Sequence, residues 1–357
     1  MEFIQDLLAA IGVVLNGIPQ GLLAMSIGFA AMPTALGFGV GAIACLLTGS
    51  VVPISFQAES IVMVKNSGKT IKERISIVLF SGILLFLVGI LGISTYITGI
   101  AGEVVLNAMM VGVGFLLVKL AFDMVKENQL VGLVSIATAT FVYLFLGKNL
   151  VYTIVISLIL SSVISKLVKK NNDSIIPSEE VKFSIVKPMC NFNVIRGTLS
   201  LTCLTIGTNI AFGSITTGLA STELNPDLLA IYVGIADSIS ALFGGGPVES
   251  IISATASAPN PTNSGVIMMV IMAVILFMGL LPKIGKYIEN QAIAGFLFVL
   301  GVFITVPNNA IVAFSGTKPG DSIVAGVTMG VTAFSDPFIG MLCGIILKFL
   351  FSIGIGI

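Results

Sequence analysis

Long stretches without any charged side chain constrain the fold of this chain more than any other feature. No Asp, Glu, Lys, Arg or His lies between Asp6 and Glu59, and further charge-free runs extend over 75–102, 197–222, 250–282 and 290–317. A helix needs about 20 predominantly apolar residues to cross a bilayer. Most of the sequence is therefore predicted to be membrane-spanning helix, in a multi-pass integral protein of the cell membrane whose first partner is the lipid bilayer.

The composition also excludes several classes of function. Only 10% of the 357 residues are charged, against about 25% in soluble domains, and a net charge of zero gives no reason to expect a nucleic-acid partner. Histidine, the commonest general base and metal ligand, is absent, and the four cysteines lack metal or redox spacing. We expect no enzyme, no metal site and no cofactor, although a coupling proton or sodium ion is compatible with the chain.

One polar stretch divides the sequence into two similar halves. A constant shift places Gly17 on Gly207 and Glu59 on Glu249, so we expect an internal repeat. The predicted organisation is a first repeat over 1–168, a polar linker over 169–195 and a second repeat over 196–357, with a core and a gate domain formed by both repeats.

Each half is predicted to hold seven segments, of which the third is short. The expected helices are 7–31, 34–48, 58–66, 73–95, 103–122, 128–146 and 149–168 in the first half, and 196–221, 226–243, 249–257, 264–282, 289–306, 309–333 and 337–354 in the second. Because seven is odd, the second half runs through the membrane in the opposite sense. The predicted fold is an all-α polytopic membrane protein with about 14 transmembrane segments in a 7+7 inverted repeat, an architecture of many secondary transporters.

The helical pattern fails just before both short segments. The first break is 48–57, with Pro53 among β-branched residues, and the second is the glycine run 243–247. These breaks predict short strands before half-helices 3 and 10. Irregular backbone at membrane depth requires protein or a cavity to supply its hydrogen bonds. Interrupted spans at matching positions of two halves therefore indicate a transport site.

Several polar side chains are candidates for that site. Glu59 and Glu249 are expected in the first turns of the half-helices, where they either bind a ligand and a coupling ion or only cap the helix. Asp237, inside the ninth span, either holds a proton or bonds structurally, for example to Asn209. Gln57 and Asn209 offer both donors and acceptors to a ligand, or join helices. Phe56 is a candidate for stacking on a ring.

The chain resembles the nucleobase–cation symporter family, the xanthine/uracil and hypoxanthine/guanine permeases. The likeness rests on 236–237, 241–244, 248–250 and 335–344. It implies fourteen helices and a base held between the two strands, by Glu249 and by backbone around Ser55, Phe56 and Gly246. The acid that this family carries on its eighth helix is missing, since 208–210 reads Thr-Asn-Ile.

A weaker resemblance is to the sulfate permease family, which has the same fold. It rests on 6–9, 18–21 and 243–255. That family usually has an arginine where Ala254 stands, and most of its members carry a C-terminal cytoplasmic domain, which we expect this protein to be without. An anion beside Glu249 without a cation would be repelled, which favours a neutral ring as the ligand.

The sequence therefore predicts a secondary active transporter of nucleobases such as purines, xanthine or uracil. We expect it to be cation-coupled and to work by alternating access. The alternative is a sulfate-permease-like anion transporter. A homodimer is compatible with either. The positive-inside rule and the resemblance to nucleobase permeases predict opposite membrane orientations, and the sequence leaves this open.

Overall fold

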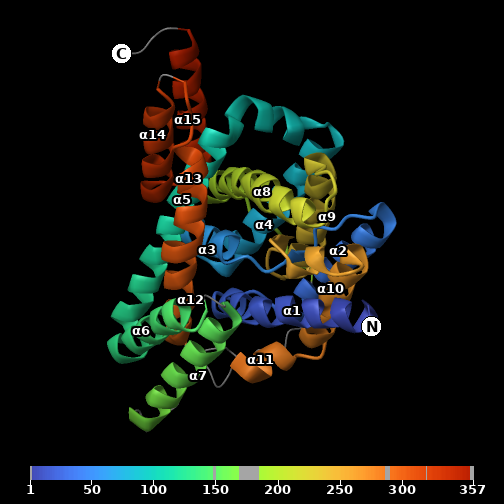
Figure 1. Ribbon diagram of the computed structural model, residues 1–357, viewed down its shortest axis with the longest axis vertical. Coiled ribbons are helices and arrows are strands. Elements are labelled where there is room, and N and C mark those ends of the chain that lie inside the picture. The colour runs from blue at the N-terminus through green and yellow to red at the C-terminus, as the bar shows by residue number, and fades with distance from the viewer. Residues whose placement is uncertain (1, 148–149, 169–184, 286–289, 319, 354–357) are drawn as a thin grey trace.

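The computed structural model describes residues 2–147, 150–168, 185–285, 290–318 and 320–353. These residues form helices and one small two-stranded sheet (Figure 1). The elements of the first half are α1 (Glu2–Ser26), α2 (Ala31–Thr48), β1 (Ile54–Ser55), α3 (Ala58–Ser67), α4 (Ile71–Ile90), α5 (Ile93–Glu127), α6 (Gln129–Phe145) and α7 (Leu150–Val168). Those of the second half are α8 (Phe192–Leu219), α9 (Pro226–Leu242), β2 (Glu249–Ser250), η1 (Ala254–Ser257), α10 (Pro261–Phe277), α11 (Leu280–Gly285), η2 (Asn290–Ile293), α12 (Ala294–Val299), η3 (Leu300–Thr305), α13 (Val306–Ala313), α14 (Asp321–Phe334) and α15 (Pro337–Ser352).

Local sequence signals explain where several helices begin and end. Gly49 adopts a left-handed conformation (φ 70°), and its N–H bonds to Cys45 at the end of α2. Thr70 and Glu73 form a reciprocal capping box at the start of α4. Asn225 and Asp336 accept backbone N–H groups at the starts of α9 and α15, and a proline follows each of them.

The two short strands, one from each half of the chain, pair with each other. β1 pairs antiparallel with β2, with Ile54 opposite Ser250 and Ser55 opposite Glu249. This confirms the prediction of a short strand in each half. A two-fold symmetry between the strands places the first residue of β1, Ile54, on the first residue of β2, Glu249. The sequence shift that placed Glu59 on Glu249 is therefore wrong for this region. The residue that occupies the place of Glu59 in the second half is Ala254.

The second half-helix differs from the prediction. Glu59 lies in the first turn of α3 as expected, but Glu249 belongs to a strand, and only the single 3₁₀ turn of η1 follows it. The predicted helix 249–257 is therefore wrong over most of its length. Matching Glu249 with Glu59 had placed Glu249 and Ser250 in a helix, whereas they form β2. Pro259 stops the 3₁₀ turn from extending further.

Two other boundaries also differ from the prediction. The expected break near Pro307 does not occur, because the π segment η3 carries the helix past this proline, and the break comes instead before Gly320. The predicted span 309–333 is therefore divided between α13 and α14. In the first half, α5 begins earlier than expected and changes direction at Gly102, which has a left-handed φ of 70°.

The helices pack as two groups, seen at the right and left of Figure 1. The strand bundle consists of α1–α4 and α8–α11 with both strands, and the outer bundle consists of α5–α7 and α12–α15. Both repeats contribute to each group. The boundaries predicted for the repeats stay a prediction, and residues 169–184 of the predicted linker lie outside the described residues.

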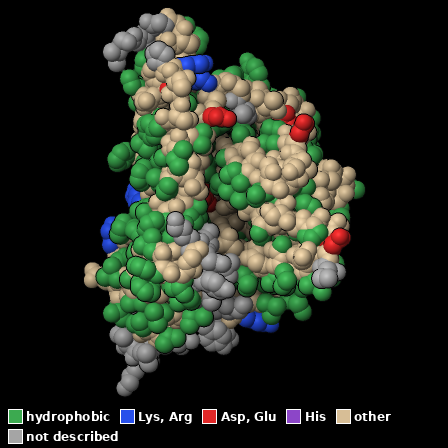
Figure 2. Space-filling view, viewed as in Figure 1, with side chains coloured by type: hydrophobic (Ala, Val, Ile, Leu, Met, Phe, Trp, Pro, Cys, Tyr) green, Lys and Arg blue, Asp and Glu red, His purple; other side chains and the backbone are tan. Residues whose placement is uncertain are grey.

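The surface of the molecule suits a lipid environment. Large apolar side chains are exposed on many helices, for example Leu47 on α2, Ile311 on α13 and Phe334 on α14. Figure 2 shows a face that is largely apolar, with only scattered charged side chains. Six helices of the described residues are long and apolar enough to cross a membrane. The chain is a multi-pass integral membrane protein.

Candidate functional site

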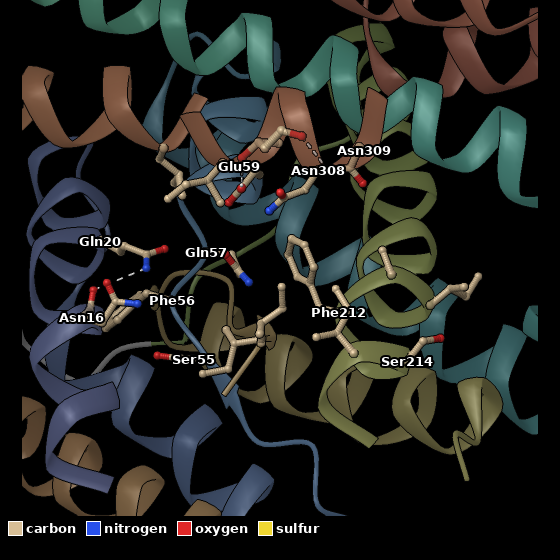
Figure 3. A pocket seen from close by; sticks show the side chains of 18 of the residues that line it. Asn16, Gln20, Ser55, Phe56, Gln57, Glu59, Phe212, Ser214, Asn308 and Asn309 are labelled. Atoms are coloured by element: carbon tan, nitrogen blue, oxygen red, sulfur yellow. Dashed lines mark hydrogen bonds between the residues drawn. The ribbon is translucent and has the colours of Figure 1, made fainter. Parts of the chain in front are cut away.

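A cavity of about 600 Å³ lies between the strand bundle and the outer bundle. The strand bundle contributes residues of α1, β1, the start of α3, α8 and the backbone just after β2. The outer bundle contributes residues of α5, α12, η3 and α13. Figure 3 shows side chains from both bundles around the same space. A movement of one bundle against the other would change the shape of this cavity.

The structure brings one group of predicted site residues to the cavity wall: Ser55, Phe56, Gln57 and Glu59. These four residues are close in sequence, and they reach the cavity wall together because α3 follows β1 almost directly. The Ser55 hydroxyl is buried and has no hydrogen-bond partner among the described residues. The Phe56 ring packs edge-on against Phe38, with ring centroids 5.3 Å apart, and is only 1% exposed. This ring is therefore held in the core of the strand bundle and offers little of its face to a ligand.

Two glutamine side chains fix the start of α3. Gln57 Nε2 donates to the carbonyl of Ser250, 3.0 Å away, and so links β1 to β2. Gln20 Oε1 on α1 accepts from the N–H of Ala58 at 2.8 Å. The first N–H groups of a helix have no partner within the helix, so Gln20 satisfies one of them from outside. Sequence reasoning did not identify Gln20.

Glu59 is the buried carboxylate of the cavity. Its side chain is 2% exposed. Thr305 Oγ1, on η3 of the outer bundle, donates to Glu59 Oε1 at 3.2 Å. Glu59 Oε2 has no partner among the described residues. The carboxylate thus makes one contact across the boundary between the bundles and keeps one oxygen free.

Glu249 is not among the residues that line the cavity. It is fully buried, and Thr205 of α8 donates to its Oε1 at 2.7 Å. Its Oε2 has no partner among the described residues. Its place in β2 makes it the strand partner of Ser55, a residue that lines the cavity. Its predicted roles in binding and coupling stay predictions.

The other three predicted residues make bonds within the strand bundle. Asp237 Oδ1 accepts from the N–H of Val248 at 2.8 Å, so its expected bond to Asn209 is absent. Asn209 Oδ1 instead accepts from the Ser250 hydroxyl at 2.8 Å, and its Nδ2 is left without a partner among the described residues. The N–H of Gly246 donates to Thr34 Oγ1 at 2.9 Å. None of these three residues lines the cavity.

Sequence reasoning missed most of the polar wall. Besides Gln20, the missed polar residues that line the cavity are Asn16 on α1, Glu103 and Asn107 on α5, Ser214 on α8, Thr305 on η3, and Asn308 and Asn309 on α13. The adjacent pair Asn308–Asn309 stands inside a charge-free run, which was an available signal. Glu103 gave no such signal, because its position near a predicted helix start is typical of a surface residue.

The cavity lining carries acidic side chains and no basic ones among the described residues. The described lining includes the carboxyl groups of Glu59 and Glu103 and several amides, but neither Lys nor Arg. No group of three or more His, Cys, Asp or Glu side chains that could hold a metal ion occurs among the described residues. The cavity therefore offers two carboxylates and neutral hydrogen-bonding groups to whatever enters it.

Comparison with known proteins identifies the fold. The sequence matches no protein-family model and no curated protein. The transmembrane domain of a cyanobacterium bicarbonate transporter, BicA, is similar with a TM-score of 0.72, at 15% identity over 96% of this chain and 98% of that chain. The murine anion transporter Slc26a9 in the inward-facing state gives 0.69, at 13% identity over 98% of this chain and 68% of that chain. A further SLC26A9 structure gives 0.72, at 12% identity over 99% and 66%. The chain has the inverted-repeat transmembrane fold of these proteins.

Proposed function

We propose that this protein is a secondary transporter that carries a small inorganic anion together with a cation, by alternating access at the cavity. The observation that carries the proposal is the cavity between the two bundles, beside the paired strands, in a fold shared over nearly the whole chain with a bicarbonate transporter and an anion transporter. These neighbours favour the sulfate-permease-like resemblance over the resemblance to nucleobase permeases.

The charge of the cavity supports cotransport of a cation. An anion 4 Å from an unneutralised carboxylate is repelled by about 4 kcal/mol at the effective dielectric typical of sites near a protein surface. The N-terminus of α3 offsets only part of this, because a helix end is equivalent to about half a positive charge. No Lys or Arg of the described lining supplies the remainder. A cation or proton that enters with the anion removes the repulsion.

A neutral nucleobase is the second candidate substrate. The observation that favours it is the amide-rich wall, in which Asn16, Gln57, Asn308 and Asn309 offer paired donors and acceptors. A carboxylate accepts N–H groups of a neutral ring without repulsion. Against it, the Phe56 ring is turned into the core, so the predicted stacking partner is not available.

Uptake into liposomes that contain the purified full chain tests both candidates. We expect saturable uptake of radiolabelled bicarbonate or sulfate that depends on an imposed sodium or proton gradient, with no competition by hypoxanthine or uracil. Uptake of a labelled base, unaffected by excess anion, would replace the main proposal with the second candidate. Flux that does not saturate would indicate a channel, and no flux of any of these solutes would reject both candidates.

A further inference from the structure

We infer that Glu59, Thr305 and Asn309 form a binding site for one monovalent cation, made jointly by the two bundles. This inference rests on the proposed transport function and names the place of the cation within it. Glu59 comes from the strand bundle, at the start of α3. Thr305 and Asn309 come from the outer bundle, at the end of η3 and within α13.

The first argument is the free oxygen of Glu59. A carboxylate that is 98% buried ordinarily has partners for both oxygens, because an unpaired buried charge is costly. Glu59 Oε1 has the Thr305 hydroxyl, whereas Oε2 is buried and has no partner among the described residues, in a side chain that belongs to the cavity wall. A cation in the cavity supplies the missing partner.

The second argument is the arrangement of neutral oxygens beside it. The Asn309 amide nitrogen donates one of its N–H groups to the carbonyl of Thr305 at 2.7 Å, which fixes the orientation of the amide and leaves Oδ1 as an oxygen that a cation can use. The Thr305 hydroxyl keeps a lone pair after donating to Glu59. Figure 3 shows the Asn309 side chain at the same edge of the cavity as Glu59. Carboxylate, hydroxyl and amide oxygens are the ligands that hard cations take in proteins.

The third argument is the irregular helix that carries Thr305. Thr305 ends the π segment η3, and Pro307, which lacks an N–H, follows two residues later. π-helical turns are rare and frequently occur at functional sites, and interrupted helices supply cation ligands in other transporters. Here the irregular turn sets Thr305 against Glu59 on the opposite bundle.

The charge of the ligands selects a monovalent cation. One carboxylate with neutral oxygens balances a single positive charge, whereas calcium sites usually gather several carboxylates. Glu103 also lines the cavity, but it is exposed and its environment differs from that of Glu59. Because the ligands come from both bundles, the cation binds most tightly when the bundles meet at this point. Its occupancy is thereby coupled to the position of the bundles.

Thermal unfolding of the purified full chain tests the site without any transported anion. Melting is compared in sodium gluconate and in N-methylglucamine gluconate at equal ionic strength, at several pH values. We expect sodium to raise the Tm of the wild type by a few degrees, as a ligand that binds only the folded state does. Glu59→Gln and Thr305→Val should lose this rise, and the matched control Glu223→Gln, at an exposed position outside the cavity lining, should keep it. Thr305→Val removes only a hydroxyl and so keeps the test valid if Glu59→Gln does not fold.

The possible outcomes identify the cation that binds, and they test the cation site and the transport function independently. If the Tm responds to pH and not to sodium, and Glu59→Gln removes that response, the cation is a proton. Equal responses of wild type and Glu59→Gln, or loss of the response in Glu223→Gln as well, overturn the inference. If sodium raises the Tm of the wild type but not of Glu59→Gln, and no uptake into liposomes is seen, the cation site is supported and the transport function is rejected. If uptake requires neither a sodium gradient nor a proton gradient, the cation site is rejected and the transport function is retained.

Discussion

Arg196 Nε of α8 lies 2.5 Å from Asp336 Oδ2 at the start of α15, in an ion pair that joins the strand bundle to the outer bundle. The Arg196 guanidinium also donates to the Ser335 hydroxyl at 2.7 Å. Asp336 Oδ1 accepts from the N–H of Ile339 and caps α15. The Asp336 carboxylate therefore caps the start of α15 and also links the two bundles. This link is separate from the contact between Glu59 and Thr305.

Replacing this arginine should loosen the contact between the bundles. The Asp336 side chain is only 7% exposed, so Arg196→Gln leaves a mostly buried charge without its partner. We expect a loss of about 1–3 kcal/mol in stability, measured as a lower Tm in detergent. The matched control is Lys126→Gln, whose ion pair with Asp123 is exposed and lies within one helix; exposed pairs contribute about 0–1 kcal/mol. Equal effects of both variants would contradict a role between the bundles.

A close approach of α1 to the strands predicts a steric variant. A Cβ atom at Gly21 would lie 2.8 Å from the Phe56 ring and 2.7 Å from Leu281. Gly21→Ala should therefore displace Phe56 towards the cavity, cost roughly 1–3 kcal/mol and reduce uptake. Gly12→Ala, on the same helix with nothing within 4 Å of the added atom, should leave both Tm and uptake near wild type. Normal uptake by Gly21→Ala would show that the strands tolerate this displacement.

Removal of the Gln20 side chain should uncap α3. Gln20→Ala leaves the N–H of Ala58 without its acceptor, and loss of a helix cap typically costs about 1 kcal/mol. Because the start of α3 also positions Glu59, we expect weaker substrate binding, seen as a higher KM for uptake. Gln129→Ala, at an exposed position at the start of α6, serves as the control. An unchanged KM would mean that β1 alone positions the start of α3.

Neutralising Glu249 tests its predicted role in transport. Glu249→Gln keeps an oxygen that accepts the Thr205 hydroxyl and removes only the charge, so we expect the Tm to stay close to wild type and uptake to be abolished. Glu223→Gln, at an exposed position after α8, should transport normally. Uptake by Glu249→Gln at the wild-type rate would reduce Glu249 to a structural residue.

The sequence was sufficient for the features that depend on local patterns. The charge-free runs located most spans, the break around Pro53 located β1, and the break at 243–247 indicated a second strand, which lies just beyond it at Glu249–Ser250. The placement of Glu249 failed because a matched charge was used to align the halves, whereas hydrogen bonding between β1 and β2 sets the actual register. A shift of a few residues exchanged a strand position for a helix position.

The wall of the cavity was mostly out of reach of sequence reasoning. Asn308 and Asn309 matter because a π segment carries α13 past Pro307 to face α3, and a proline normally predicts the end of a helix. Glu103 faces the cavity only because α5 turns at Gly102. Both positions depend on irregular backbone, which periodicity of apolar residues does not encode.

The brevity of the paired strands has a consequence for the working cycle. Each strand has two residues, so sliding one past the other by a single residue would turn Ser55 away from the solute and leave almost no pairing behind. Separating the two strands to open the transport pathway would disrupt the binding site in every transport cycle. In the proposed transport cycle we therefore expect the paired strands to move together as one rigid unit, against the outer bundle at the interface where Glu59 contacts Thr305.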